Sequence, residues 1–115
     1  MSRKSRSRKA VERRASASVF AALGDETRLF LVAKLCGGER QSISQLASGS
    51  RLTRQAITKH LRVLESARIV RSVRAGRECL FEFNPKPMDE TKKYLDFVSE
   101  RWDQALARLK SFVER

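Results

Sequence analysis

Apolar residues recur every three to four positions along most of the chain, which is the period of helices with one packed face. The first such stretch, 16–23, ends at Gly24, and Asp25 then has a side chain suited to cap a helix over about 26–36. Two glycines end this second helix. We expect its interior face to consist of Leu29, Val32, Leu35 and Cys36.

Two more helices follow, each opened by a capping residue. Ser42 and Gln45 have the spacing of a capping box, which begins a short helix that ends near Gly49. Thr53 caps a longer helix over 53–67. At about 100° per residue, the packing face of this helix carries Ala56, Ile57, His60, Leu61 and Leu64. The opposite side is a polar, cationic ridge that carries Gln55, Thr58, Lys59 and Arg62.

β-Branched and aromatic residues fill two runs, RIVRSVR and RECLFEF, that meet at Ala75-Gly76. This pattern predicts a β-hairpin in which Arg74 and Arg77 flank the turn. Two prolines break the chain after the hairpin, and a last helix is predicted from about 88 to 113. Its apolar positions step by three and four residues: Leu95, Val98, Trp102, Ala105, Leu109 and Phe112. A heptad seam of this regularity predicts a partner helix.

The length of 115 residues, with 41% apolar and 33% charged residues, predicts one domain, and no apolar run is long enough to cross a bilayer. We place this domain at 15–115, with a C-terminal dimerisation helix at 86–115. Residues 1–14 have almost nothing apolar to bury and are expected to form a disordered basic arm without the features of a secretory signal. Cys36 and Cys79 match neither a disulfide framework nor a metal spacing, which is typical of a cytoplasmic protein. Because Cys36 lies on an apolar helix face and Cys79 in an apolar strand, we expect buried structural cysteines, with a redox switch as the alternative.

The net charge of +12 is concentrated in two blocks of the sequence. Residues 1–14 carry seven Lys and Arg against one Glu, and residues 51–77 carry eight against one. The segments 15–50 and 78–115 are nearly balanced. Because the second basic block lies within a predicted helix and hairpin, its charge forms a stripe on folded elements, which is typical of nucleic-acid-binding proteins.

Two short helices joined by a tight turn and followed by a hairpin make a winged helix-turn-helix, so the expected fold class is mainly α with a small β-hairpin wing. The major groove of DNA accepts one helix, whose donor-bearing side chains read base edges. We expect the residues that enter the groove to be Arg54, Gln55, Thr58 and Lys59. Nearer the DNA backbone, where cations neutralise phosphates, we expect Thr53, Arg62, Arg74 and Arg77.

These segments also resemble a known family. The resemblance is to the ArsR/SmtB family of winged-helix transcriptional repressors, and it is carried by ALGDETRLFLVAKL, ISQLASGSRLTRQAITKHLRVLESARIV and RSVRAGRECLFEFNP. It runs from about Val19 to the C-terminus, and its most specific part is TRQAITKHLRVLE. It implies a homodimer through the first and last helices. The interface residues expected on this basis are Val19, Leu23, Leu95, Val98, Trp102, Leu109 and Phe112.

The chain departs from the metal-sensing members of that family at two positions. Their Cys-x-Cys pair aligns with Ser42 and Ser44, and serine hydroxyls are poor ligands for the metals that thiolates bind. The last helix also contains no His. We therefore expect no metal site and no cofactor, and the segment RWDQALARLKSFVE resembles the non-metal branch. A further departure is Arg68, where the family usually has Gly ending the recognition helix. A left-handed conformation of Arg68 costs on the order of 1 kcal/mol, so the corner either carries that cost or is built differently.

Several side chains are open to a second interpretation. His60 lies on the packing face of its helix and is expected to be a hydrogen-bonded core residue rather than a ligand. Tyr94, Phe97 and Trp102 are expected to serve packing or dimerisation, with an effector pocket as the alternative. The sequence contains no phosphate loop, nucleophile elbow or H-E-x-x-H motif, so we do not expect an enzyme.

The leading hypothesis is a dimeric repressor that regulates its own operon by sequence-specific binding of double-stranded DNA. The helix 53–67 would occupy the major groove, and the wing at 74–77 would contact the backbone or the minor groove. One alternative is a nonspecific architectural DNA-binding protein, because the N-terminal block is strongly basic. Another is a protein-interaction module that uses the C-terminal heptad seam. The operator sequence, the regulated genes and any small-molecule effector are left open.

Overall fold

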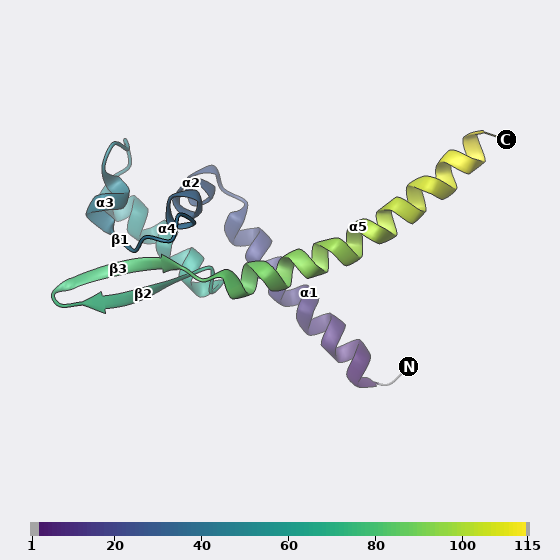
Figure 1. The fold of residues 1–115 in the computed structure, drawn as a ribbon, viewed down its shortest axis with the longest axis horizontal. Helices are drawn as coiled ribbons and strands as arrows, with labels where there is room; N and C mark the ends of the chain where they lie inside the picture. The colour runs from purple at the N-terminus through teal and green to yellow at the C-terminus, as the bar shows by residue number, and fades with distance from the viewer. Residues whose placement is uncertain (1–2, 115) are drawn as a thin grey trace.

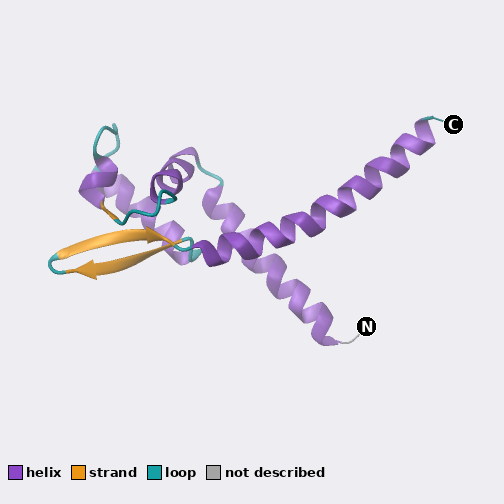
Figure 2. Cartoon of the chain, viewed as in Figure 1, coloured by secondary structure: helices purple, strands orange, loops and turns teal. Residues whose placement is uncertain are grey.

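Five helices and three strands make up residues 3–114, the part of the chain that the computed structural model describes. In chain order they are α1 (Arg3–Leu23), α2 (Glu26–Leu35), β1 (Gln41–Ser42), α3 (Ile43–Ala47), α4 (Arg54–Ser66), β2 (Val70–Ala75), β3 (Glu78–Phe83) and α5 (Pro85–Val113). The elements α2, α3, α4 and the sheet form a body, and α5 crosses α1 and extends beyond it (Figure 1). The molecule therefore measures 64 × 36 × 22 Å. The predicted class, mainly α with a small β-hairpin wing in a winged helix-turn-helix, is confirmed (Figure 2).

All three predicted helix caps are present. The Asp25 carboxylate accepts a hydrogen bond from the Arg28 backbone N–H at 3.0 Å, and Thr53 Oγ1 accepts one from the Ala56 N–H at 3.1 Å. Ser42 and Gln45 form the reciprocal capping box, in which each side chain accepts from the backbone N–H of the other residue. These bonds satisfy backbone donors that a helix leaves free at its start, which fixes where α2, α3 and α4 begin.

The core lies where α2, α3, α4 and the sheet meet, and the inward face of α4 is the predicted one. Ile57, Leu61 and Leu64 are at most 1% exposed. They pack with buried apolar residues of the neighbouring elements, among them Val19, Leu31, Leu35, Leu46, Ile69, Val70 and Phe81. Val19 was predicted to contribute to a dimer interface, but it is only 3% exposed and packs within its own subunit.

The predicted inner face of α2 is wrong in part. Its buried residues are Leu31, Val32 and Leu35, whereas Leu29 is 52% exposed and Cys36 is exposed. The run from Leu29 to Val32 is wholly apolar, so the period of the sequence does not determine which side chains point inward. Packing against α4 and the sheet selects Leu31 and Leu35, which lie one helical turn apart.

The sheet is antiparallel and has the strand order β1-β3-β2. β1 was not predicted, because it has only two residues, both polar, and pairs Gln41 with Phe81 of β3. In the hairpin Ala75 pairs with Glu78, so the loop is Gly76-Arg77, one residue later than expected. Gly76 has φ 63°, which suits the first position of a type II′ hairpin turn.

Cys79 is exposed, contrary to the expectation that it is buried. It pairs with Arg74 near the turn end of the hairpin, and that end projects beyond the body (Figure 1). The body therefore covers neither face of the sheet there. The sequence pattern gives the alternation of a strand, but it does not show how far the strand extends past the core.

The structure also differs from the prediction of a disordered arm over 1–14, because residues 3–14 belong to α1. The helix continues alongside α5, and the Lys9 ammonium lies 4.1 Å from the centroid of the Phe97 ring, within the range of a cation–π contact. This contact comes from a residue 88 positions later in the chain, so local composition does not reveal it. Residues 1, 2 and 115, which belong to the predicted arm and domain, lie outside the described residues.

The corner after α4 is built on a strained residue, so the alternative that it is built differently from the glycine corner of the family is wrong. Arg68 has φ 64°, the only non-glycine residue with positive φ in the described part of the chain. Its N–H donates to the Glu65 carbonyl at 2.9 Å, and the Ile69 N–H donates to the Leu64 carbonyl at 3.0 Å. These two bonds are the Schellman pattern, in which the left-handed position is usually glycine.

Replacing Arg68 by Gly should therefore raise the free energy of unfolding by about 1 kcal/mol, because glycine adopts positive φ without a Cβ penalty. The measurement is urea denaturation at a fixed protein concentration. Arg68→Ala keeps the Cβ and removes the same charge, so it serves as the control and should give no such gain. Equal stability of the two variants would contradict this assignment of strain.

Candidate nucleic-acid interface

The outer face of α4 presents the predicted polar ridge to solvent. Thr53, Arg54, Gln55, Lys59 and Arg62 are exposed, and Thr58 is half-buried. We call these six residues the α4 ridge. Because Ile57, Leu61 and Leu64 occupy the core, the rotation of the helix about its axis is fixed, and Gln55, Thr58, Lys59 and Arg62 point away from the interior. Thr53 and Arg54 are exposed because they lie at the start of the helix. The side chains at its N-terminal end include the donors that can read base edges in a major groove.

Thr58 differs from the other members of the ridge. Its hydroxyl donates a hydrogen bond to the Arg54 carbonyl at 2.7 Å, one turn earlier in the helix. The hydroxyl proton is therefore used within α4, and the oxygen lone pairs are the groups left for an outside partner. The sequence places Thr58 on the correct side of the helix but gives no sign of this bond.

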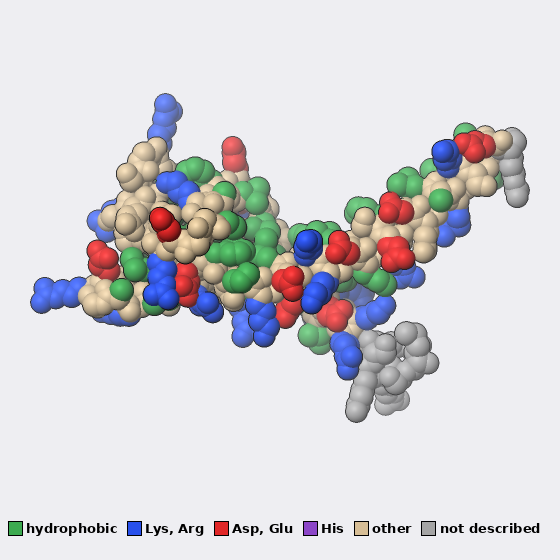
Figure 3. All heavy atoms as spheres, viewed as in Figure 1, with side chains coloured by type: hydrophobic (Ala, Val, Ile, Leu, Met, Phe, Trp, Pro, Cys, Tyr) green, Lys and Arg blue, Asp and Glu red, His purple; other side chains and the backbone are tan. Residues whose placement is uncertain are grey.

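The wing adds a second cationic surface. Arg74 lies on β2 opposite Cys79, and Arg77 is the second loop residue of the hairpin; both are exposed. Figure 3 shows Lys and Arg side chains extending from the tip of the hairpin. Arg51 is also exposed, in the loop that leads to the Thr53 cap. It is not among the DNA-binding residues predicted from the sequence. The charge excess of 51–77 was the available signal for it.

One carboxylate of the body engages two arginines. Glu82 accepts hydrogen bonds from Arg40 Nε at 2.8 Å and from Arg71 Nε at 2.6 Å, and Arg71 lies directly across the strands from it. The side-chain hydrogen bond from Arg40, followed by that from Arg71, lowers the pKa of Glu82 from its ordinary value. By contrast, the arginines and lysine of the α4 ridge and wing make no ion pair with any residue between 8 and 114. Their charge is directed to solvent.

His60 lies behind the ridge and joins α4 to the junction of α1 and α2. Its Nδ1 lies 3.3 Å from Arg28 Nη1 and 3.7 Å from Asp25 Oδ2. The Arg28 guanidinium also donates to the carbonyl of Ala22. The backbone hydrogen bond from Arg28 is the largest cause of the lowered pKa of Asp25. His60 is within hydrogen-bond distance of Arg28 on the packing side of α4, as expected, but it is half-buried and lies at the edge of the core instead of within it.

No cluster of three or more His, Cys, Asp or Glu side chains with metal-site geometry occurs among residues 3–114. Ser42, one of the two positions aligned with the metal-binding cysteines, is occupied with the capping box of α3. No helix of the described chain combines the length and apolar content needed to cross a membrane.

The other residues predicted for a dimer interface lie mostly on one open face of α5. Leu95, Trp102, Leu109 and Phe112 are exposed, and Leu23 and Val98 are half-buried. A groove of about 990 Å³ runs between α1 and α5, and its aromatic lining includes Tyr94, Phe97 and Trp102. The structure thus leaves a largely apolar surface of α5 without a covering element.

Comparison with known proteins supports the interpretation of the α4 ridge as a nucleic-acid interface. Residues 25–72 match the model of the family described as bacterial regulatory protein, arsR family. The chain is 38% identical over 84 residues to the uncharacterized HTH-type transcriptional regulator YuzN of Bacillus subtilis, covering 66% of this chain and 89% of that protein. It is 29% identical over 93 residues to the HTH-type transcriptional regulator Rv2034 of Mycobacterium tuberculosis, covering 81% and 83%.

Solved structures give the same result. An ArsR-like transcriptional regulator from Rhodococcus sp. RHA1 matches with a TM-score of 0.74 and 40% identity, covering 85% of this chain and 92% of that one. The homodimeric winged helix-turn-helix DNA-binding domain Mb0332 from Mycobacterium bovis matches with a TM-score of 0.64 and 21% identity, covering 86% and 88%. At 21% identity, the match to the M. bovis domain shows a shared fold only.

The pairing of Glu82 with two arginines makes the stability of the sheet pH-dependent. Since the folded-state pKa of Glu82 lies below its ordinary value of 4.5, the pairing stabilises the fold above pH 4.5 and is lost as the pH falls through the lower folded-state value. We expect Glu82→Gln to unfold more easily than the parent at neutral pH, with the difference shrinking below pH 4.5.

Chemical denaturation from pH 3 to pH 7 measures this difference, a range chosen to span roughly the ordinary carboxylate pKa values. Glu78→Gln removes one negative charge from the same strand without breaking an ion pair of the described chain, and it is the matched control. A constant difference between the parent and Glu82→Gln across the range would show that the ion pairs do not stabilise the sheet.

Proposed function

Since the chain belongs to the arsR family of helix-turn-helix transcriptional regulators, we propose that it is a homodimeric repressor that binds a specific DNA operator and regulates its own operon. The observation that carries this proposal is the outward orientation of the α4 ridge, whose cations have no internal ion-pair partners within residues 8–114. A helix of this kind reads base edges with its N-terminal side chains while flanking cations hold phosphates.

In the proposed complex, α4 lies in the major groove. Arg54, Gln55 and Lys59 face base edges, and Thr58 offers its hydroxyl oxygen. Thr53 and Arg62 lie nearer the phosphates at the two ends of the helix. Arg74 and Arg77 carry the wing onto the backbone or into the adjacent minor groove, and the exposed Arg51 adds a phosphate contact before α4.

A second copy of the chain is needed for two helices to enter successive major grooves. The exposed apolar face of α5 supports a dimer, and the M. bovis relative in fold is described as homodimeric. Two-fold symmetry then predicts a roughly palindromic operator with half-sites about 10 bp apart, or a multiple of that distance. Occupation of a promoter by such a dimer excludes other proteins from the same DNA, which is the physical basis of repression. A cytoplasmic location follows from this role.

The primary experiment is fluorescence anisotropy with a duplex from the region upstream of the chain's own gene and with a scrambled duplex of equal composition. At physiological salt we expect the upstream duplex to bind at least about 10³-fold more tightly. The affinity should fall steeply as salt rises, because phosphate contacts release counterions. A specificity ratio near one would instead identify a nonspecific architectural protein and would overturn the proposal.

Two substitutions separate base reading from phosphate binding. Gln55→Ala should relax preference at one base position and cost about 1–3 kcal/mol on the operator, while Arg77→Ala should weaken binding to both duplexes by a similar factor and reduce the salt slope by about one. Binding curves on operator and scrambled duplexes at several salt concentrations measure both effects.

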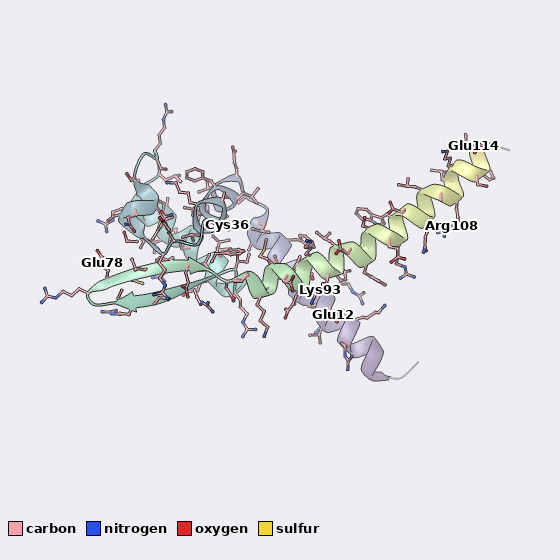
Figure 4. The ribbon with its side chains drawn as sticks, in the orientation of Figure 1. Glu12, Cys36, Glu78, Lys93, Arg108 and Glu114 are labelled. Atoms are coloured by element: carbon pink, nitrogen blue, oxygen red, sulfur yellow. The ribbon has the colours of Figure 1, made fainter. Side chains whose placement is uncertain are left out.

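Arg108→Ala is the control for these variants, since it removes one positive charge from the far half of α5, away from the wing (Figure 4). It should leave the affinity within about twofold of the parent, because screening weakens charges beyond roughly 10 Å from the DNA. The opposite pattern, with Arg77 altering base preference and Gln55 affecting all DNA equally, would show that the two roles are assigned wrongly.

A further inference from the structure

Two apolar surfaces of the chain are left uncovered in the structure. The first is on the far half of α5, where Trp102, Leu106, Leu109 and Val113 are each at least 59% exposed. These four residues lie within about 60° of one another around the helix axis. We call them the distal stripe. Figure 3 shows hydrophobic side chains along one edge of this part of α5.

The second surface is on α2. Leu29 and Phe30 are 52% and 45% exposed, Ala33 is exposed one turn further, and Cys36 ends the same row. We call these residues the α2 outer face. The opposite face of α2 is already buried in the core, so this helix is apolar on both sides. Lys34 Nζ lies 5.0 Å from the centroid of the Phe30 ring and covers part of this face, and the apolar area that stays exposed at Leu29, Phe30 and Ala33 is available to a partner.

The chain cannot bring its own two surfaces together. The helix α5 is continuous over 29 residues, and its far half points away from the body that contains α2 (Figure 1). Its start is held to the body by Asn84, whose N–H donates to the Ile69 carbonyl at 2.8 Å and whose side-chain amide donates to the Arg68 carbonyl at 3.0 Å. The distal stripe can therefore reach an α2 outer face only in another molecule.

We propose that the distal stripe of α5 packs against the α2 outer face of a second copy of the chain, and that the partner's stripe returns the same contact. This arrangement refines the dimer of the proposed function and rests on it. A two-fold dimer makes each contact twice, so one association covers all four apolar surfaces. The stripe spans about 17 Å and the α2 outer face about 11 Å, so the stripe is long enough to cover that face.

The position of the distal stripe also supports a second copy of the chain as its partner. It continues along α5 from the crossing with α1, where Tyr94, Phe97 and Val98 line the groove described above. The expected dimer surface therefore runs without a break from the crossing to the end of the helix. It adds α2 to an interface that the family resemblance places at the first and last helices, and it supplies the partner surface that the buried Val19 cannot provide.

Cysteine crosslinking tests this contact directly, because Cys36 is a native thiol at the end of the α2 outer face (Figure 4). In full-length chains carrying Cys79→Ser, Leu106→Cys and Leu109→Cys are each combined with native Cys36. With a short bis-maleimide, we expect at least one of them to form a covalent dimer that disappears when Cys36→Ser is added. Ser111→Cys lies about 180° from Trp102 on α5 and is the matched control, which should give at least tenfold less product.

A second measurement covers the case in which the crosslinker does not fit. Leu29→Glu replaces a half-exposed side chain outside the core, so the subunit should fold while self-association weakens at least tenfold in sedimentation equilibrium. Thermal unfolding verifies that the variant is folded. No crosslink to Cys36 together with unchanged self-association of Leu29→Glu overturns the proposal, as does a parent chain that is monomeric. A crosslink of the Leu109→Cys variant that survives Cys36→Ser would place α5 against α5 and overturn it as well.

These results are separable from the DNA-binding experiment. If the parent chain is a dimer that binds its operator but Cys36 and Leu29 are not in the interface, only this contact is wrong. If the crosslink forms and the parent does not discriminate between duplexes, the contact holds and the proposed function fails.

Discussion

The packing of Ile57, Leu61 and Leu64 into the core is the constraint on which the remaining structure depends. These side chains fix the rotation of α4 about its axis, and that rotation alone decides whether Gln55 and Lys59 face solvent or protein. The Thr53 cap sets where the helix begins, and the Arg68 corner sets where it ends. The position of the candidate DNA-reading side chains is thus determined by apolar contacts on the other side of the same helix.

Charge is divided between the body and the candidate DNA-binding surface. Glu82 holds Arg40 and Arg71 on the sheet, and Asp25 lies beside Arg28 and His60 behind α4. These contacts take those cations out of competition for an external anion. The remaining cations of α4 and the wing lie on exposed positions, where a polyanion meets little desolvation cost and several charges at once. The net charge of the chain is therefore less informative than the location of its few carboxylates.

Most of the fold, and the orientation of the candidate site, could be predicted from the sequence because the signals are local. A capping residue and its partner lie three positions apart. The helical period of α4 is unambiguous, since most of its apolar and polar residues lie on opposite faces. The incorrect predictions concern segments that lack a local signal or whose structure depends on distant parts of the chain. Leu29 to Val32 has no unique period, β1 is too short to have one, and the helical state of residues 3–14 accompanies contact with distant α5. The exposure of Cys36 and Cys79 likewise depends on where the body ends.

The attachment of α5 through Asn84 has a mechanical consequence. The helix is about 43 Å long; two hydrogen bonds hold its start to the corner that follows α4, and it packs against α1 where the two helices cross. It therefore acts as a lever that turns about its start, and this start lies beside α4, the candidate DNA-reading helix. A tilt of about 10° at the start of α5 would displace its far end by about 7 Å. In a symmetric dimer the same tilt would change the distance between the two α4 helices. Whatever governs the angle of this lever, even tens of ångströms away from the duplex, would govern whether the pair fits the helical repeat of DNA.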